Sequence, residues 1–279
     1  MKPSALLAAG PLAFLLLFLA GPLALLLRVS LYAPAWGRGF YQPGSWSLES
    51  FGEIARDPTL RQVAGFTLAL GLLVTALTLA LAYPLALFIH SLPDRVRRLA
   101  IACGLLPKLC NVLVLIFGLQ LLLSGAGPIS QALLGLGLTR EPVLLYRNLA
   151  GAVIGEVYLL LPYAVLLILV GLARIDPELL AAARGLGASP WQVFWRVTWP
   201  LSWPGVLAAA QLALVWALAA VLGPLLLGGP EQTTLGVEIQ RQALEYHRWP
   251  RAAALAVLLL VLLTLVLALL TRAQRTSEG

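Results

Sequence analysis

Charged residues are scarce in this chain of 279 residues, because Asp, Glu, Lys and Arg together make up 11% of it, against about 25% in ordinary soluble domains. Hydrophobic residues make up 60% and gather in long runs. This composition excludes an ordinary soluble domain and predicts a membrane protein. The 19 basic residues outnumber the 12 acidic ones, and beside apolar runs this excess is typical of membrane-flanking charge rather than of nucleic-acid binding.

Lysine is nearly absent, since Lys2 and Lys108 are the two lysines of the chain. A phosphate-binding loop needs the pattern Gly-x-x-x-x-Gly-Lys-Ser/Thr, which the sequence does not contain. We therefore expect no bound cofactor in this chain, and the sequence argues against an ATPase with a phosphate-binding loop.

Cysteine and histidine are equally rare. Cys103 and Cys110 lie seven residues apart in what we predict to be one helix, which would separate them by roughly 10 Å, too far for a disulfide. His90 and His247 are isolated, and no His, Cys, Asp or Glu residues have the spacing of metal ligands. The sequence thus predicts neither a metal site nor an enzyme.

Six apolar runs have the length of about 20 residues that a transmembrane helix needs. They cover residues 5–27, 63–89, 99–123, 149–173, 205–227 and 250–271. The first run exceeds the apolar core of about 7–15 residues found in signal peptides, so we interpret it as an anchor span. The sequence therefore predicts an all-α membrane protein with six transmembrane helices.

The orientation follows from the positive charges, although their simple count on the two sides is a tie. Arg95, Arg97 and Arg98 crowd the shortest loop, which favours a cytoplasmic loop and both termini in the cytoplasm. Residues 28–62 and 228–249 are then external.

The spans also divide the chain. Residues 1–62 form an N-terminal anchor and external segment, residues 63–271 a five-span core with a cytoplasmic loop at 174–204, and residues 272–279 a cytoplasmic tail.

The polar-edged stretch 176–205 predicts two short helices joined by a tight turn. Asp176 has the position of an N-cap, with Pro177 and Glu178 in the first turn that follows. Gly187 is expected to end this first helix, because glycine adopts the left-handed conformation of a C-terminal cap without steric cost.

The second helix begins at Ser189, which forms the pattern of a capping box with Gln192 and precedes Pro190. Pro200 and Pro204 are expected to end it and to begin the next span. A tryptophan recurs at every fourth residue of this stretch: Trp191, Trp195, Trp199 and Trp203. On a helix they would form one stripe, either an aromatic belt at the membrane surface or a contact with a partner protein.

The spacing of this stretch resembles the cytoplasmic EAA loop of ABC-importer permeases, which reads Glu-Ala-Ala, three residues, Gly, nine residues, Ile, any residue, Leu-Pro. The resemblance implies an ATPase-coupling loop formed by Glu178, Ala181, Ala182, Ala183, Gly187, Ala188, Ser189, Val197 and Pro200. Ala181 stands where the family has Glu, and Glu178 lies one turn earlier on nearly the same helix face, where it could supply the missing charge.

The resemblance extends from about residue 45 to 271 and is strongest to the spermidine/putrescine-type branch, first permease subunit. It is carried by Asp57-Pro58, Leu105-Leu106-Pro107 through Asn111, Gly118, Ser124-x-x-Gly127, Ile154-Gly155 to Leu161-Pro162-Tyr163, and Leu227-Gly228-Gly229. It implies a type I (MetI-like) importer fold with a cytoplasmic coupling helix, in a bacterial inner membrane. It also implies three partners: a second homologous permease, an ATPase dimer and an external solute-binding protein that the outer segments would meet.

Two ionisable residues fall within predicted spans, Lys108 and Glu156, near mid-depth. They either pair with each other, or Glu156 lines the translocation pathway and meets a cationic solute. Asn111, Gln120 and Tyr158 are further pathway candidates, and each is equally compatible with a hydrogen bond between helices.

The solute stays open. Many permeases of the polyamine branch carry an Arg shortly after Asn111, whereas residues 112–116 here are apolar and the charge stands at Lys108. The first hypothesis is that the transported solute is a polyamine or another small organic molecule. The alternative is an inorganic ion or a thiamine-like or sugar-like solute. A secondary transporter is disfavoured, because the sequence lacks matched inverted halves.

Overall fold

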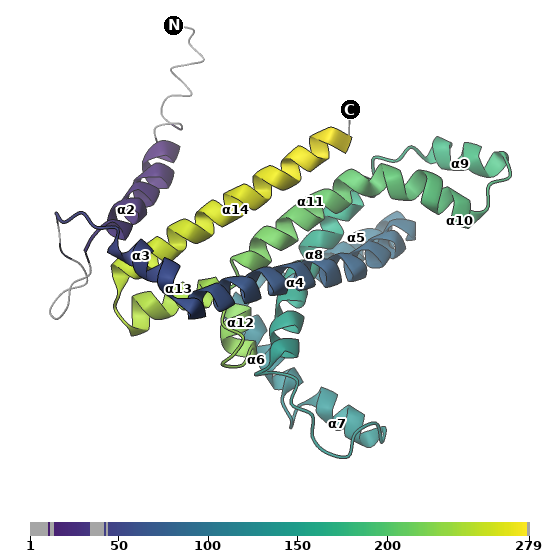
Figure 1. Ribbon diagram of the computed structural model, residues 1–279. Helices are drawn as coiled ribbons and strands as arrows, with labels where there is room; N and C mark the ends of the chain where they lie inside the picture. Colours follow the sequence, from purple (N-terminus) through teal and green to yellow (C-terminus); the bar gives the residue numbers. More distant parts are fainter. Residues whose placement is uncertain (1–10, 12–13, 34–41, 43, 278–279) are drawn as a thin grey trace, which may run out of the picture. The chain divides into compact units, whose positions relative to one another are not determined.

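The computed structural model describes residues 11, 14–33, 42 and 44–277, and every regular element within them is a helix (Figure 1). Five helical segments are long and apolar enough to cross a membrane: Pro58–Ser91, Val112–Gly135, Leu149–Leu172, Pro190–Leu218 and Trp249–Arg272. A shorter apolar helix, Leu16–Ser30, lies where the first span was predicted, and the beginning of that span falls outside the described residues. The all-α membrane class is confirmed.

The chain forms two compact units. Among the described residues, one unit consists of those up to residue 63 together with 235–264, and the other of residues 64–234 and 265–277. The first unit contains η1 (Leu16–Ala20), α2 (Gly21–Ser30), α3 (Glu49–Arg56), α13 (Leu235–Gln240), η4 (Arg241–Glu245) and most of α14 (Trp249–Ser277). The second contains most of α4 (Pro58–Ser91), α5 (Asp94–Leu105), η2 (Leu106–Leu109), α6 (Val112–Leu123), α7 (Pro128–Gly135), α8 (Leu149–Leu172), α9 (Pro177–Gly185), α10 (Pro190–Val193), η3 (Phe194–Thr198), α11 (Trp199–Leu218) and α12 (Leu222–Leu227).

An ion cluster joins three elements of the first unit. The Arg251 guanidinium of α14 contacts Glu53 Oε2 of α3 at 3.3 Å and Asp57 Oδ2 at 2.6 Å. Asp57 also caps the start of α4 by accepting the Thr59 N–H. Burial alone would raise the pKa of Asp57, but the Thr59 and Arg251 bonds favour the ionised form and hold this pKa below its ordinary value.

The core of the second unit is the contact of α8 with α11. Small residues allow the two backbones to approach closely, because Ala209, Ala213 and Ala217 form one buried face of α11. At the crossing, a Cβ on Gly205 would lie 2.9 Å from the Cα of Gly171. Any larger side chain at this point would push the two helices apart.

The third predicted span, 99–123, is wrong as a continuous helix. The structure ends α5 at Leu105, passes through η2 and begins α6 at Val112, with the Asn111 side chain accepting the Leu113 N–H as N-cap. Pro107 explains the break in part, because it lacks an N–H for an α-helical bond. Cys103 therefore lies in α5, whereas Cys110 follows the end of η2, and both are free thiols.

The fifth predicted span, 205–227, is also interrupted. The helix α11 ends at Leu218, and α12 begins at Leu222 after a short non-helical link. Pro224 has no N–H and cannot donate to the Ala220 carbonyl. The Thr234 hydroxyl donates to this carbonyl instead, at 2.8 Å. Since residues 219–227 stay apolar throughout, hydropathy alone carries no sign of this break.

The expectation that Pro200 and Pro204 end the second short helix is wrong as well. The chain remains helical from Pro190 to Leu218, because the turn before Pro200 widens into the π-helix η3, in which the Trp199 N–H bonds to the Phe194 carbonyl. A π turn accommodates the proline that an α turn would exclude. The helix that starts at the hairpin is thus the same helix that forms the span.

Candidate functional site

The helical hairpin of α9 and α10 is built by the capping residues that its sequence predicts. The Asp176 carboxyl accepts the Glu178 N–H at 2.9 Å at the start of α9. Ser189 and Gln192 form the capping box of α10, in which each side chain accepts the other residue's backbone N–H. Local hydrogen bonds therefore fix both helix starts without help from the rest of the fold.

The turn between the two helices depends on Gly187, whose φ is +81°. The Gly187 N–H bonds to Arg184 O at 2.9 Å and the Ala188 N–H bonds to Ala183 O at 3.1 Å. This pair of bonds is a Schellman motif, in which the left-handed residue satisfies the last carbonyls of the helix. The sequence-based prediction of a glycine turn at this point is confirmed.

The hairpin carries apolar side chains that the described chain leaves exposed. Leu186 at the turn is 90% exposed, and Trp191 is 69% exposed. Ala181 and Ala182 are also exposed, whereas Ala183 is half-buried. Figure 1 shows the hairpin at the end of α11 that lies away from α12. Such an exposed apolar surface on a projecting element is typical of a docking site.

The four tryptophans form the ladder that their spacing predicts. The ring centroids of successive members are 5.5, 5.8 and 5.6 Å apart, from Trp191 through Trp195 and Trp199 to Trp203. Trp199 is half-buried and packs edge-on against Tyr83 of α4, with 4.9 Å between the ring centroids. Trp199 therefore anchors α11 to α4, whereas Trp191, at the outer end of the ladder, is exposed.

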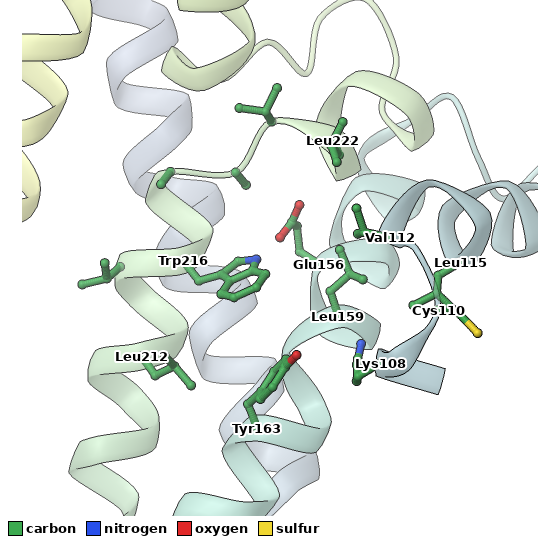
Figure 2. A pocket seen from close by; sticks show the side chains of 14 residues that line it. Lys108, Cys110, Val112, Leu115, Glu156, Leu159, Tyr163, Leu212, Trp216 and Leu222 are labelled. Atoms are coloured by element: carbon green, nitrogen blue, oxygen red, sulfur yellow. The ribbon is translucent and has the colours of Figure 1, made fainter. Parts of the chain in front are cut away.

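A second feature of this unit is a cavity of about 510 Å³ beside α8 and the link between α11 and α12 (Figure 2). Glu156 and Tyr163 face it from α8, Trp216 from α11 and Lys108 from η2. Glu156, Leu159 and Tyr163 lie on one face of α8 because they are spaced by three and four residues. The cavity combines an apolar wall with groups of both charges.

Glu156 is 1% exposed, and its carboxyl lies against the start of α12, where a Cβ on Gly223 would be 2.2 Å from Oε1. Its Oε2 has no hydrogen-bond partner among the described residues. In Figure 2 this carboxyl points into the cavity. A buried carboxyl oxygen without a donor is costly, so it is suited to receive a donor from outside the chain.

Lys108 forms no ion pair with Glu156 in the structure, although both line the cavity. Its ammonium donates to the Tyr158 carbonyl oxygen at 3.2 Å, and it lies 4.9 Å from the Tyr158 ring centroid and 5.9 Å from that of Tyr163. The cation–π contacts and the carbonyl hold the ammonium where the two charges do not meet.

The other pathway candidates have structural partners. Asn111 caps α6, and the Gln120 amide donates to the Leu226 carbonyl, joining α6 to α12. Tyr158 supports Lys108 through its ring and its carbonyl. None of these three is among the described residues that line the cavity of Glu156.

Sequence reasoning missed Gly223. A Cβ there would lie 2.2 Å from Glu156 Oε1, so the position admits only glycine while Glu156 keeps its place. A glycine directly before Pro224 in an apolar run was the available signal. Elsewhere in the described residues, no three His, Cys, Asp or Glu side chains gather as metal ligands.

The part of the chain that contains the hairpin and the cavity matches a known family of membrane proteins. Residues 80–276 match the model of the family described as binding-protein-dependent transport system inner membrane component. The chain therefore belongs to this family, the permease subunits of ABC importers.

Among its relatives is the spermidine/putrescine transport system permease protein PotB of Escherichia coli (strain K12), which is 35% identical over 219 residues, covering 78% of this chain and 80% of the relative. The resemblance to the polyamine branch is thereby confirmed.

The fold is shared with solved importers of lower sequence identity. A bacterial ABC transporter involved in the import of the acidic polysaccharide alginate matches with a TM-score of 0.77 and 18% identity, over 98% of this chain and 94% of that chain. The same kind of transporter in complex with an alginate pentasaccharide-bound periplasmic protein also matches, with a TM-score of 0.77 and 19% identity over 99% and 96%. The importer permease fold expected from the resemblance is confirmed.

Proposed function

We propose that this chain forms half of the translocation pathway of an ATP-driven importer for a polyamine or another small organic solute. A second, homologous permease supplies the other half, and a separate ATPase dimer binds the ATP. The chain lies in the bacterial plasma membrane with both termini in the cytoplasm. The name of the PotB relative supports a nitrogenous organic solute.

The observation that carries this proposal is the capped, exposed hairpin of α9 and α10. Its two caps and the Gly187 turn make it rigid, and Leu186 and Trp191 offer an apolar surface. A rigid exposed element that continues directly into a span transmits the movement of whatever binds it. The proposal assigns that role to the ATPase.

The charges near the hairpin support its cytoplasmic location. A pocket of about 530 Å³ is lined by His90 near the end of α4, by Arg97 in the first turn of α5, and by Pro177 and Leu180 of α9. The hairpin thus shares one end of its unit with the arginine-rich turn. Arginine clusters of this kind favour the cytoplasmic side.

The external segments supply the proposed contact with a solute-binding protein. They contain α3 and α13, both of the first unit. The alginate transporter with its periplasmic protein supports a partner of this kind.

The test is co-purification followed by ATP hydrolysis. An affinity-tagged chain should isolate a second permease and an ATPase, and the reconstituted complex should hydrolyse ATP faster when its loaded binding protein is added. Solute uptake by this chain alone in vesicles without ATP would contradict the proposal and favour a secondary transporter.

A further inference from the structure

The cavity beside Glu156 presents two opposite charges to the same space. Glu156 contributes Oε2, which has no donor among the described residues despite the burial of the side chain. Lys108 contributes an ammonium with three N–H donors. Within the described chain this ammonium donates to one acceptor, the Tyr158 carbonyl oxygen. Both groups therefore keep hydrogen-bonding capacity for a ligand.

The wall between these groups is apolar and aromatic. Figure 2 shows Leu159 between Glu156 and Lys108, with the Trp216 and Tyr163 rings beside them. A volume of about 510 Å³ falls within the range of about 300–1,000 Å³ that small-molecule sites occupy. The apolar wall suits a short methylene chain, and the two charged groups suit its ends.

The charge at Lys108 discriminates between classes of solute. A diamine would satisfy Glu156 with one ammonium but would carry its other ammonium into the cavity that already contains Lys108, and like charges repel. A solute with one cationic and one anionic end meets an opposite charge at both ends.

We propose that this cavity recognises a small zwitterion, with the solute ammonium on Glu156 Oε2 and its acidic group on Lys108 Nζ. This inference rests on the proposed function, because it takes the cavity to be part of the translocation pathway. It narrows the solute from small organic molecules to those that carry both charges on a short chain.

The test compares two probes of equal chain length on the whole importer, purified with its partner permease and ATPase and without binding protein. Putrescine is a four-carbon diamine, and 4-aminobutanoate is a four-carbon chain in which a carboxylate replaces one terminal aminomethyl group. Equilibrium binding of the radiolabelled probes should favour 4-aminobutanoate by about tenfold, which corresponds to roughly 1.4 kcal/mol.

Two variants of Lys108 assign this preference to its charge. Lys108→Met keeps the chain length and should lower 4-aminobutanoate binding about tenfold without weakening putrescine binding, since it removes the partner of the carboxylate alone. Lys108→Glu should reverse the preference. Lys2→Met is the matched control, because it removes the other lysine of the chain. The basal ATP hydrolysis rate of each variant reports whether its complex has assembled.

Three outcomes overturn the inference: equal or tighter binding of putrescine, no binding of either probe, or an unchanged preference in Lys108→Met. Stimulation of ATP hydrolysis by the loaded binding protein is measured on the same preparation. If that stimulation is present while the probe preference is absent, the zwitterion inference fails and the importer function stands.

Discussion

The Glu156 carboxyl occupies the space that a side chain at Gly223 would need. A Cβ on Gly223 would lie 2.2 Å from Glu156 Oε1 and 3.0 Å from its Cδ. Gly223 therefore lets the start of α12 approach the carboxyl of α8 closely on the Oε1 side, while Oε2 has no partner among the described residues.

Gly223→Ala should destabilise the protein by about 1–3 kcal/mol, because the added methyl overlaps a buried side chain. Thermal unfolding of the purified complex measures this loss. The cost should fall sharply when Glu156→Ala is also present, since that change removes the three atoms nearest to the new methyl. An equal cost in both backgrounds would contradict the close contact. Gly104→Ala is the control, because a Cβ there meets nothing within 4 Å.

Replacements of Gly187 should uncouple ATP hydrolysis from transport in the order Val worse than Asn. A non-glycine residue in the left-handed conformation costs about 1–2 kcal/mol, and Asn tolerates it best. The structure assigns this effect to backbone strain, since a Cβ on Gly187 would meet nothing within 4 Å. The ratio of solute imported to ATP hydrolysed is the measurement, and an unchanged ratio in Gly187→Val would count against the hairpin as the coupling element.

Two members of the tryptophan ladder, Trp199 and Trp191, should respond differently to replacement by leucine. Trp199→Leu should lower thermal stability, by about 1–3 kcal/mol, because Trp199 packs on Tyr83. Trp191→Leu should leave stability within about 0.5 kcal/mol and weaken association with the ATPase, because Trp191 is 69% exposed. Equal effects of both changes on stability would show that the ladder acts only as a packing element.

Gly205→Ala should destabilise the crossing of α8 and α11 by about 1–3 kcal/mol. The new methyl would lie 2.9 Å from the Cα of Gly171 and 2.9 Å from the Leu167 carbonyl oxygen, and neither backbone atom can move without shifting a helix. Gly185→Ala, where a Cβ meets nothing within 4 Å, is the matched control in thermal unfolding.

Asp57→Asn should lower stability by about 0.5–1 kcal/mol at neutral pH, because it removes the charge facing Arg251 while Asn still caps α4. The pKa of Asp57 is lower in the folded state than in the unfolded state. Its charge therefore stabilises the fold above the ordinary pKa, and that contribution is lost as pH falls through the lowered value. The difference in unfolding temperature between wild type and variant should shrink over this acidic range.

Those parts of the structure that depend on local bonds could be predicted from the sequence. Asp176, Gly187 and Ser189 act on partners within a few residues, so their roles in the hairpin follow from spacing alone. The broken spans could not be predicted in this way. In the link between α11 and α12, the Ala220 carbonyl accepts a hydrogen bond from Thr234, which lies 14 residues further along the chain.

The cavity was predicted only in part. Glu156 and Lys108 were identified because ionisable residues are rare in apolar runs. The sequence does not show that the two side chains stay apart. Lys108 lies on η2 and donates to the Tyr158 carbonyl rather than to Glu156. The contact of Gly223 with Glu156 joins residues far apart in sequence, and no local pattern reports it.

The uninterrupted helix from Pro190 to Leu218 has a mechanical consequence. Its 29 residues connect the Gly187 turn, just before one end, to the link at 219–221, just beyond the other. That link borders the cavity through Ala219, Ala220 and Val221. A push on the hairpin is therefore delivered along one continuous helix to the rim of the compartment that would hold the solute.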